Sequence, residues 1–395
     1  MYICILGRQP EISFAELEAV FGKANLKHFG KIAVLDVEDI SARQFERLGG
    51  TIKIAEVISN DWNDIMSFLP ESGKAVVGLS SYNTNLNAKT LTKIAVAIKK
   101  HRKSVRFVPN KKSDLSSAQI IHNKLIGSDN KFEFILAEAD GAKMLAQTLY
   151  IQDIKSYSNR DYGRPRRDAK NGMLPPKLAQ IMINLAVQDT KSRHDLDPSK
   201  KRAKPKTIPV ILDPFCGTGV VLQEAALMGY NVYGTDIEQK MIDFTIANLK
   251  WLSASHKVNF FEKLEVGDAT KMNWQPVMDF VVAETSLGKP YFVEPTIEAL
   301  RQNVKKCNKL VEKFLENLYS QIKKDTRLCL AVPAWNVGGK NYRLSIIRRL
   351  KDLGYEQQKV SAKPLLYRRK DQIVGRELLV LKKVKKTAKM EDKKE

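Results

Sequence analysis

The chain has 395 residues, 43% of them hydrophobic, and a formal net charge of +22. It therefore has room for two or three domains with cores of their own, and its charge favours a polyanionic partner over a Lys-rich surface that serves only solubility. No apolar run reaches the ~18–20 residues of a membrane span, and the strand-like start reaches charge and proline too early for a signal peptide, so we expect no membrane contact.

Residues 1–72 predict a small α+β unit that is acidic, with 7 Lys and Arg against 11 Asp and Glu. Alternating apolar residues indicate strands, and helical spacing of apolar residues before a terminal glycine indicates helices. The predicted strands are 2–7, 31–37 and 52–58, and the predicted helices are 11–22 and 41–50.

A second, basic α+β unit is predicted for residues 73–155. Residues 73–150 carry 13 Lys and Arg against 5 Asp and Glu, which favours RNA or another polyanion. Lys111 and Lys112 are its candidate RNA contacts. The predicted strands are 74–82, 104–110, 131–140 and 143–153, and the predicted helices are 87–102 and 116–127.

Residues 156–207 predict a basic connector. Its first half is too rich in Arg, Gly and Pro for regular structure, a helix begins at Pro175 and Pro176, and a polar loop, expected to be mobile, follows. Residues 151–207 carry 14 Lys and Arg against 6 Asp and Glu. The run "RPRR" fits either a solvated turn or contact with RNA phosphates, and we favour phosphate contact for Arg164, Arg166 and Arg167.

Strands and helices alternate from residue 208 to residue 383, which predicts a doubly wound α/β sheet. Residues 384–395 read as a disordered basic tail. The predicted strands are 208–213, 231–236, 264–270, 278–284 and 326–334, followed by a hairpin over 356–383. The predicted helices are 219–228, 238–252, 298–324 and 342–354.

A glycine turn follows the first of these strands, in "DPFCGTG". It lacks the third glycine of a dinucleotide-binding fingerprint and the GK[ST] of a phosphate-binding loop. Asp213, Asp236 and Asp268 end three successive predicted strands, so their carboxylates meet at one edge of the sheet. Any one of them could be only a turn or N-cap acid. Together they suit the positively charged S-adenosylmethionine, with Asp213 at its ammonium, Asp236 at its ribose and Asp268 at its adenine.

The four cysteines (Cys4, Cys216, Cys307 and Cys329) are far apart without a CxxC pair, so we expect a reduced, cytoplasmic protein without disulfides or a bound metal. Cys216 lies beside the glycine turn. A covalent nucleophile for cytosine methylation belongs after the fourth strand instead, so we read Cys216 as a small packing residue.

The motifs "DPFCGTG" and "RDYGRPRRDAKNGMLPPKLAQIMINLA" resemble the tRNA guanosine-10 N2-methyltransferase family, over essentially the whole chain from Met1 to about Lys383. The resemblance implies a ferredoxin-like domain over 1–72, a THUMP-like RNA-binding domain over 73–155 and a Rossmann-like methyltransferase domain over 208–383. It also implies S-adenosylmethionine as cofactor and tRNA as partner. The cofactor-binding residues that it implies are Gly172, Met173, Leu174, Asp213, Phe215, Gly217, Gly219, Asp236, Ile237, Asp268 and Ala269.

One segment departs from this family. Where the family has Asp-Pro-Pro-Tyr-Gly, this chain has Glu284-Thr285-Ser286-Leu287-Gly288. A guanine amine needs hydrogen-bond acceptors that turn its lone pair toward the methyl donor, and the flipped base needs a stacking partner. Glu284 keeps a carboxylate at this place, and Tyr291 or Phe292 could stack on the base. The candidate catalytic residues are therefore Glu284, Gly288 and Tyr291.

The sequence thus predicts a cytoplasmic, monomeric S-adenosylmethionine-dependent methyltransferase acting on a guanine N2 amine of tRNA. Two alternatives stay open: a DNA adenine N6-methyltransferase, and a catalytically weak RNA-binding protein in which Glu284 is only a strand-end acid. The exact nucleotide, mono- or dimethylation and the need for a small activating subunit are not fixed by the sequence.

Overall fold

The computed structural model describes residues 1–168, 173–188, 207–275, 278–369 and 371–386, and it divides the chain into two compact units, Met1–Ser158 and Asn159–Glu395. The polar loop predicted after residue 188 and the end of the predicted tail lie outside the described residues.

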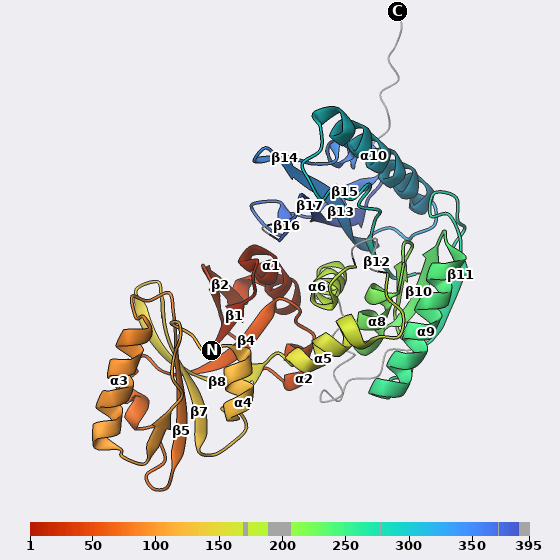
Figure 1. The fold of residues 1–395 in the computed structure, drawn as a ribbon. Coiled ribbons are helices and arrows are strands. Elements are labelled where there is room, and N and C mark those ends of the chain that lie inside the picture. The colour runs from red at the N-terminus through yellow and green to blue at the C-terminus, as the bar shows by residue number, and fades with distance from the viewer. Residues whose placement is uncertain (169–172, 189–206, 276–277, 370, 387–395) are drawn as a thin grey trace, which may run out of the picture. The chain divides into compact units, whose positions relative to one another are not determined.

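The first unit is built on one eight-stranded sheet with the order β2-β3-β1-β4-β8-β7-β5-β6 (Figure 1). The two halves predicted as separate α+β units, 1–72 and 73–155, each contribute four strands to it. They join where β4 pairs antiparallel with β8. The strands are β1 (Tyr2–Leu6), β2 (Leu26–Phe29), β3 (Ile32–Leu35), β4 (Thr51–Ser59), β5 (Ala75–Tyr82), β6 (Val105–Phe107), β7 (Lys131–Ala139) and β8 (Ala142–Ile151).

Capped helices cover this sheet. The side chains of Ser41, Asn87 and Ser116 each accept a hydrogen bond from a backbone N–H of the helix that follows, which satisfies donors left free at helix starts. Apolar residues that include Ile3 of β1 and Ile135 of β7 form one core that spans both halves. The helices are α1 (Pro10–Phe21), α2 (Ala42–Glu46), α3 (Ala88–His101), α4 (Ser117–Asn123) and α5 (Ile154–Ser158), with short 3-10 turns at η1 (Lys23–Asn25) and η2 (Trp62–Met66).

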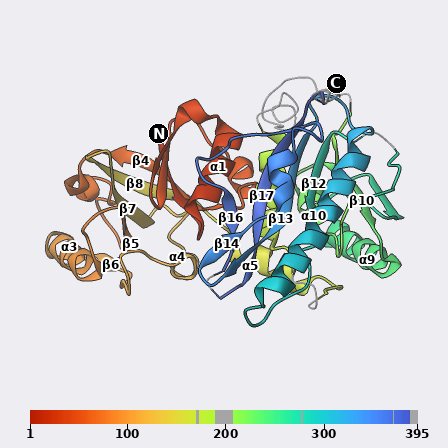
Figure 2. The same ribbon diagram turned by 90° about the horizontal axis from the view of Figure 1, so that it is seen from above.

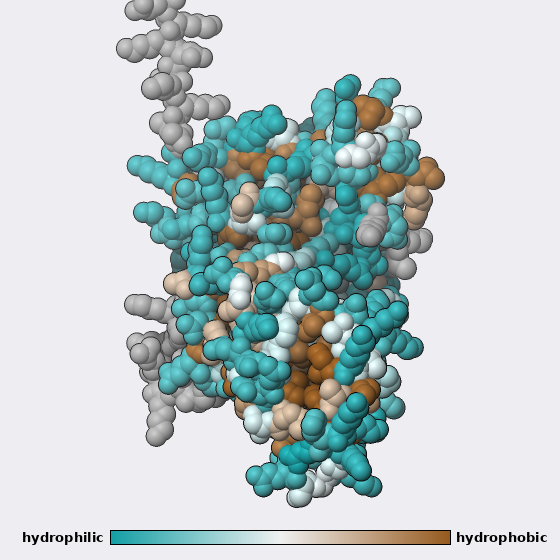
Figure 3. Space-filling view, turned by 90° about the vertical axis from the view of Figure 1, so that its left-hand side faces the viewer, coloured by the Kyte–Doolittle hydropathy of each residue, from teal (hydrophilic) through white to brown (hydrophobic). Residues whose placement is uncertain are grey.

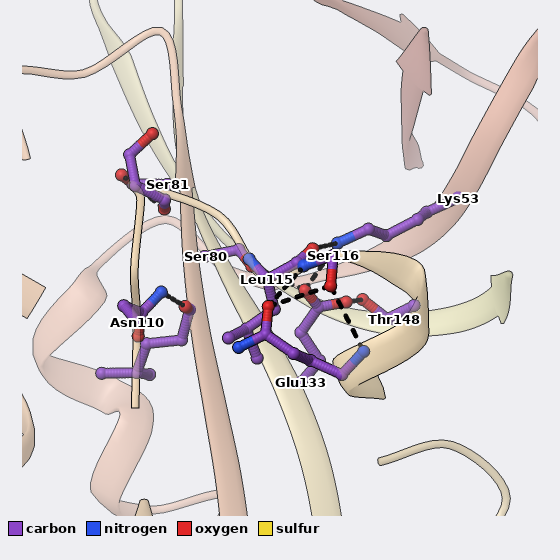
Figure 4. A network of polar contacts seen from close by, with 11 residues as sticks. Lys53, Ser80, Ser81, Asn110, Leu115, Ser116, Glu133 and Thr148 are labelled. Carbon is purple, nitrogen blue, oxygen red and sulfur yellow. Dashed lines mark hydrogen bonds and ion pairs between the residues drawn. The ribbon is translucent and has the colours of Figure 1, made fainter. Parts of the chain in front are cut away.

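A buried ion pair joins the two halves of the first unit (Figure 4). The Nζ atom of Lys53 in β4 lies 2.7 Å from Oε1 of Glu133 in β7, and both side chains are almost fully buried. Ser80 donates to the same oxygen at 2.6 Å, and Thr148 donates to the other oxygen at 2.6 Å. Lys53 also donates to the carbonyl of Leu115 at 3.1 Å. Each charge is therefore hydrogen-bonded, as a buried charge requires.

The second unit contains a mixed sheet with the order β11-β10-β9-β12-β13-β17-β15, in which β14 also pairs with β13 and β16 with β17. Strands β9 to β13 are parallel, and β17 runs antiparallel to β13. The strand order reverses between β9 and β12, which is where doubly wound sheets bind ligands. The strands are β9 (Val210–Asp213), β10 (Asn231–Asp236), β11 (Glu262–Val266), β12 (Phe280–Glu284), β13 (Arg327–Val337), β14 (Lys340–Tyr342), β15 (Tyr355–Gln357), β16 (Leu365–Tyr367) and β17 (Val374–Lys383).

Helices cover both faces of this sheet. The apolar side of α10, which includes Val311, Phe314 and Leu318, packs into a core with inward residues of the strands, and Figure 2 shows α10 running alongside β12 and β13. The helices are α6 (Pro176–Val187), α8 (Val220–Leu227), α9 (Gln239–His256) and α10 (Ile297–Tyr319).

Two segments of the second unit differ from the sequence prediction. The helix predicted over 342–354 is a 3-10 helix, η4 (Ser345–Arg349). Its N-cap residue, Leu344, has an apolar side chain that cannot accept a hydrogen bond from the N–H groups of the first turn. The connector, predicted to be irregular, forms a π-helical turn, η3 (Asn159–Gly163). Arg160 in this turn makes a buried ion pair with Glu224 of α8 at 2.7 Å, which ties the connector to the sheet domain.

Hydrophilic side chains dominate the face of the molecule seen in Figure 3, with apolar areas between them. Among the residues that the structure describes, none of the helices combines the length and the apolarity needed to span a membrane.

Candidate active site

Three carboxylates lie at the ends of three adjacent parallel strands. Asp213 is the last residue of β9, Asp236 is the last residue of β10, and Asp268 follows β11 by two residues. Because β10 lies between β9 and β11, the three acids stand in a row along one edge of the sheet.

Asp213 is a buried acid that has no cationic partner among the described residues. Its side chain is 2% exposed, and its Oδ1 atom accepts a hydrogen bond from the N–H of Phe215 at 3.1 Å. Burial raises the pKa of Asp213 well above its usual value, and the negative charges of Asp236 and Glu284 raise it further. A cationic ligand would relieve this cost, because it would stabilise the ionised carboxylate.

Asp236 holds the glycine turn. One of its oxygens accepts the N–H of Gly217 at 2.9 Å, and the other accepts the N–H of Glu238 at 3.0 Å. A carboxylate offers about four lone-pair positions, so two ribose hydroxyls can still be bound. Ile237, the next residue, is 67% exposed and offers an apolar surface beside this acid.

Both glycines of the turn have positive φ angles, +51° at Gly217 and +80° at Gly219. A Cβ atom on Gly217 would meet nothing within 4 Å, whereas one on Gly219 would lie 2.9 Å from Thr245 of α9. Thr245 donates a hydrogen bond to the carbonyl of Gly217 at 2.8 Å. The turn is therefore fixed on its α9 side and open at Gly217, where a ligand can approach the backbone closely.

The close packing that a third glycine would provide comes from another strand. Gly234 of β10 lies so close to Leu222 of α8 that a Cβ atom would be 2.4 Å from the leucine methyl. Cys216 is buried next to this contact, and burial raises the pKa of its thiol well above the usual value. A neutral, buried thiol agrees with a packing role for Cys216.

Asp268 is held by its own turn. Its Oδ1 atom accepts the backbone N–H of Thr270 at 2.9 Å and the hydroxyl of Thr270 at 2.7 Å, and these bonds lower the pKa of Asp268. The neighbouring Ala269 is buried, and its carbonyl accepts a hydrogen bond from Asn317 of α10 at 3.1 Å.

The structure describes two of the three connector residues that were expected to bind the cofactor. Gly172 lies outside the described residues. Leu174 is buried, and the sulfur of Met173 lies 2.8 Å from Nη2 of Arg164. Arg164 is only 3% exposed, which corrects the expectation that it faces RNA phosphates, because burial directs its guanidinium into the protein.

The other basic candidates lie on the surface. Arg166 and Arg167 are exposed, and their guanidinium groups lie over the rings of Phe244 and Tyr162. Lys111 and Lys112 are exposed in the first unit, between β6 and α4.

Glu284, at the end of β12, forms an ion pair with Arg376 of β17. The side chain of Glu284 is 18% exposed, and that of Arg376 is 6% exposed. Burial raises the pKa of Glu284, while the positive charge of Arg376 lowers it. Sequence reasoning missed Arg376, although Arg376 and Glu377 are two adjacent charges directly before the apolar residues 378–381 of this strand.

The segment after Glu284 is fixed to α10. Thr285 is buried and extends the strand pairing by donating its N–H to Ala331 at 3.0 Å. Gly288 has a φ angle of +75°, and a Cβ atom there would lie 2.3 Å from Oδ1 of Asn303. Tyr291 donates its hydroxyl to the carbonyl of Ala299 at 3.2 Å. Gly288 and Tyr291 therefore shape this segment, and both line a cavity beside α10.

Comparisons with known proteins agree with this geometry. Residues 200–351 match the family described as "RMKL-like, methyltransferase domain". A tRNA (guanine(10)-N2)-dimethyltransferase of Pyrococcus abyssi is 27% identical over 342 residues, which cover 84% of this chain and 88% of that protein. The chain is therefore similar to a tRNA (guanine(10)-N2)-dimethyltransferase over most of its length.

Two further comparisons show how much of the chain is similar to known proteins. A tRNA (guanine(10)-N2)-dimethyltransferase of Methanothermobacter thermautotrophicus is 30% identical over 162 residues, which cover 41% of this chain and 39% of that protein. The crystal structure of TrmN from Thermus thermophilus has a TM-score of 0.52 at 13% identity, covering 97% of this chain and 99% of that one. The second likeness is one of fold, and the mixed sheet of the second unit is consistent with a methyltransferase fold.

Proposed function

We propose that this protein transfers a methyl group from S-adenosylmethionine to the N2 amine of guanine 10 in tRNA. The observation that carries the proposal is the row of Asp213, Asp236 and Asp268 at the carboxyl edge of β9, β10 and β11, in which the buried Asp213 has no cationic partner among the described residues. The names of the archaeal relatives supply the substrate.

The residues at this edge fit the cofactor. The ammonium of the methionine moiety would neutralise Asp213, and the open backbone at Gly217 leaves space for it. Asp236 would accept the ribose hydroxyls, while Asp268 and Ala269 would face the adenine, with Ile237 against the adenine ring. Phe215, Gly219, Met173 and Leu174 would complete the walls. When bound, S-adenosylmethionine supplies a methyl group on a positively charged sulfur, which is the electrophile of the reaction.

Glu284 is the residue proposed to act on the substrate. Its Oε1 atom is engaged by Arg376, and its Oε2 atom accepts no hydrogen bond from the described residues, so Oε2 can accept one from the guanine amine. The carboxylate turns the nitrogen lone pair toward the methyl group and stabilises the positive charge that develops on nitrogen. Arg376 keeps Glu284 ionised in a buried position. Gly288 and Tyr291 shape the loop beside it.

The first unit is proposed to hold the tRNA. Strands β1 to β4 have the order β2-β3-β1-β4 with antiparallel neighbours, which is the arrangement of a ferredoxin-like βαββαβ unit. The basic residues 73–150, including the exposed Lys111 and Lys112, would form a THUMP-like surface that binds RNA by phosphate contacts and shape.

One observation favours a second candidate, a catalytically weak tRNA-binding protein. Arg376 occupies one oxygen of Glu284 and reduces the negative charge available to the substrate amine. In this case Glu284 is a strand-end acid whose partner is Arg376, and the chain keeps the cofactor fold without efficient turnover.

The test is methyl transfer from labelled S-adenosylmethionine to an unmodified tRNA transcript, followed by nucleoside analysis. We expect N2-methylated guanosine, and no product from a matched transcript with adenosine at position 10. Methylation of DNA adenine would support the alternative chemistry. Binding of both tRNA and cofactor without transfer would support the catalytically weak protein.

A further inference from the structure

A cavity of about 420 Å³ lies between the segment that follows Glu284 and the helix α10. The segment contributes Ser286, Gly288, Lys289 and Tyr291 to its wall, and α10 contributes Gln302 and Lys306 among others. This volume is within the range of small-molecule sites. None of the functions proposed above uses the two lysines of this wall.

The walls of the cavity are preformed. Asn303 of α10 accepts the N–H of Lys289 at 3.1 Å and donates to the carbonyl of the same residue at 3.2 Å. Gly288 packs against Asn303 without room for a Cβ atom, and Tyr291 is bonded to Ala299. The segment is thus held on α10 at Lys289 and at Tyr291, so a ligand need not order it.

The charge of the cavity is positive. Lys289 and Lys306 are exposed, and neither forms an ion pair with an acid in the described parts of the chain. The exposed side of α10 adds further cations near Lys306, namely Arg301, Lys305, Lys309 and Lys313. The two ammonium groups, together with the amide of Gln302, which has no hydrogen-bond partner among the described residues, form a site for an anion with several acceptor oxygens.

An exposed aromatic residue accompanies the cations. Phe292, next to Tyr291, is 95% exposed, and Val293 is 77% exposed. A flat ring beside a cationic groove is the arrangement by which proteins bind single-stranded nucleic acid, with the phosphate on the cations and a base on the ring.

We propose that this cavity binds one nucleotide of the RNA strand next to the methylated base, with its phosphodiester on Lys289 and Lys306 and its base on Phe292. The inference rests on the proposed tRNA substrate and adds an RNA contact on the methyltransferase unit itself. A nucleotide held here, close in sequence to Glu284, keeps the strand unstacked beside the base that enters the active site.

The experiment measures binding of an unmodified tRNA by the full chain, by fluorescence anisotropy over a range of salt concentrations. Lys306→Ala, alone and with Lys289→Ala, should weaken binding. It should also make the salt dependence less steep, so that the magnitude of the slope of log affinity against log salt falls by about 1, the loss of one phosphate contact. Phe292→Ala should weaken binding and leave the slope unchanged. Lys305→Ala is the matched control, since Lys305 is an exposed lysine of the same helix that does not line the cavity.

Equal effects of Lys305→Ala and Lys306→Ala would overturn the proposal, because they would indicate diffuse charge rather than a site. Unchanged binding in the double lysine variant would overturn it as well. Guanosine monophosphate is the probe for a free nucleotide: tight binding that Lys306→Ala abolishes would replace the RNA strand by a mononucleotide ligand. Methyl transfer by the wild-type protein is measured in parallel. Its absence alongside the expected binding pattern refutes the proposed activity and leaves the RNA site standing.

Discussion

Arg376 of β17 donates a hydrogen bond to the carboxylate of Glu284 at the end of β12, past the intervening strand β13. The two residues are 92 positions apart in the sequence. The sequence resemblance predicts that Glu284 takes the place of an aspartate, and the additional methylene group of glutamate gives it a longer reach toward the guanidinium. The pairing offsets part of the rise in pKa that burial causes at Glu284.

The pH dependence of turnover should respond to this pairing. Burial raises the pKa of Glu284 and Arg376 lowers it, so Arg376→Gln leaves only the effect that raises it. In the proposed mechanism turnover needs the ionised carboxylate, so turnover should increase as pH rises through this pKa. We expect the acidic limb of the profile of kcat against pH to move to higher pH in Arg376→Gln.

Arg376→Lys is the control for that change, because it retains the positive charge and should keep the limb near its wild-type position. Glu284→Gln should lose the limb altogether and reduce turnover about 10²–10³-fold, as removal of one preorganised electrostatic contact does. An identical acidic limb in the Gln and Lys variants would contradict the assignment. Melting curves of all variants separate this effect from unfolding.

Asp213 should make cofactor binding dependent on pH. Its pKa is raised by burial and by nearby negative charge, whereas the proposed cofactor is a cation that should bind the ionised form. Affinity for S-adenosylmethionine should therefore increase as pH rises through the pKa of Asp213, and binding below that pKa should release a proton. Calorimetry in two buffers of different ionisation enthalpy measures this proton.

The same acid lowers the stability of the protein without its cofactor. A carboxyl group whose pKa is raised in the folded state makes its full contribution to stability below its unfolded pKa. The free energy of unfolding then falls as pH rises toward and through the pKa of the folded state. Asp213→Asn should therefore raise the melting temperature of the cofactor-free protein at neutral pH and abolish cofactor binding. A lower melting temperature would show that the ionised Asp213 stabilises the fold by itself.

Gly288→Ala should destabilise the second unit. Gly288 has a positive φ angle, and the new methyl group would lie 2.3 Å from Oδ1 of Asn303 and 2.9 Å from the sulfur of Cys307. We expect a loss of about 1–3 kcal/mol in the free energy of unfolding. Gly338→Ala is the matched control, since Gly338 has a φ angle of +56° and open space around it. Equal losses at both positions would mean that only backbone strain matters.

Reversing the charge of Lys111 and Lys112 to glutamate should weaken tRNA binding and reduce its salt dependence. The control reverses Lys23 and Lys27, which are exposed lysines in the acidic residues 1–72. If both pairs change binding equally, net charge rather than a surface on residues 73–150 determines affinity. Filter binding at several salt concentrations distinguishes these results.

The row of acids was predictable because an apolar run followed by an acid marks the end of a buried strand, and parallel strands bring such ends together. The contacts of other residues in the candidate site were not predictable from the sequence. Arg376 reaches Glu284 only because β17 enters the sheet next to β13, and no local pattern predicts that neighbour. Gly234 similarly provides helix packing from a strand, where a motif search examines only the glycine turn.

Two predictions of secondary structure differ from the structure. Strand β2 was missed because only Leu26 of its four residues is buried, so its sequence shows no alternation. The segment 342–354 has helical spacing, but the N–H of Ile346 is bonded to the side chain of Asn308 in α10 at 2.9 Å. That contact fixes the start of the segment from outside, and a 3-10 helix forms.

The sheet shared by both halves of the first unit makes one polarised body from an acidic and a basic sequence. Residues 1–72 have an excess of negative charge and residues 73–150 an excess of positive charge, and β4 and β8 join them through backbone hydrogen bonds. Rotation of one half against the other would separate Lys53 from Glu133 in the interior. The unit therefore carries a fixed electric dipole that turns an approaching polyanion toward one half before any contact forms, an effect on the rate of association that added salt weakens.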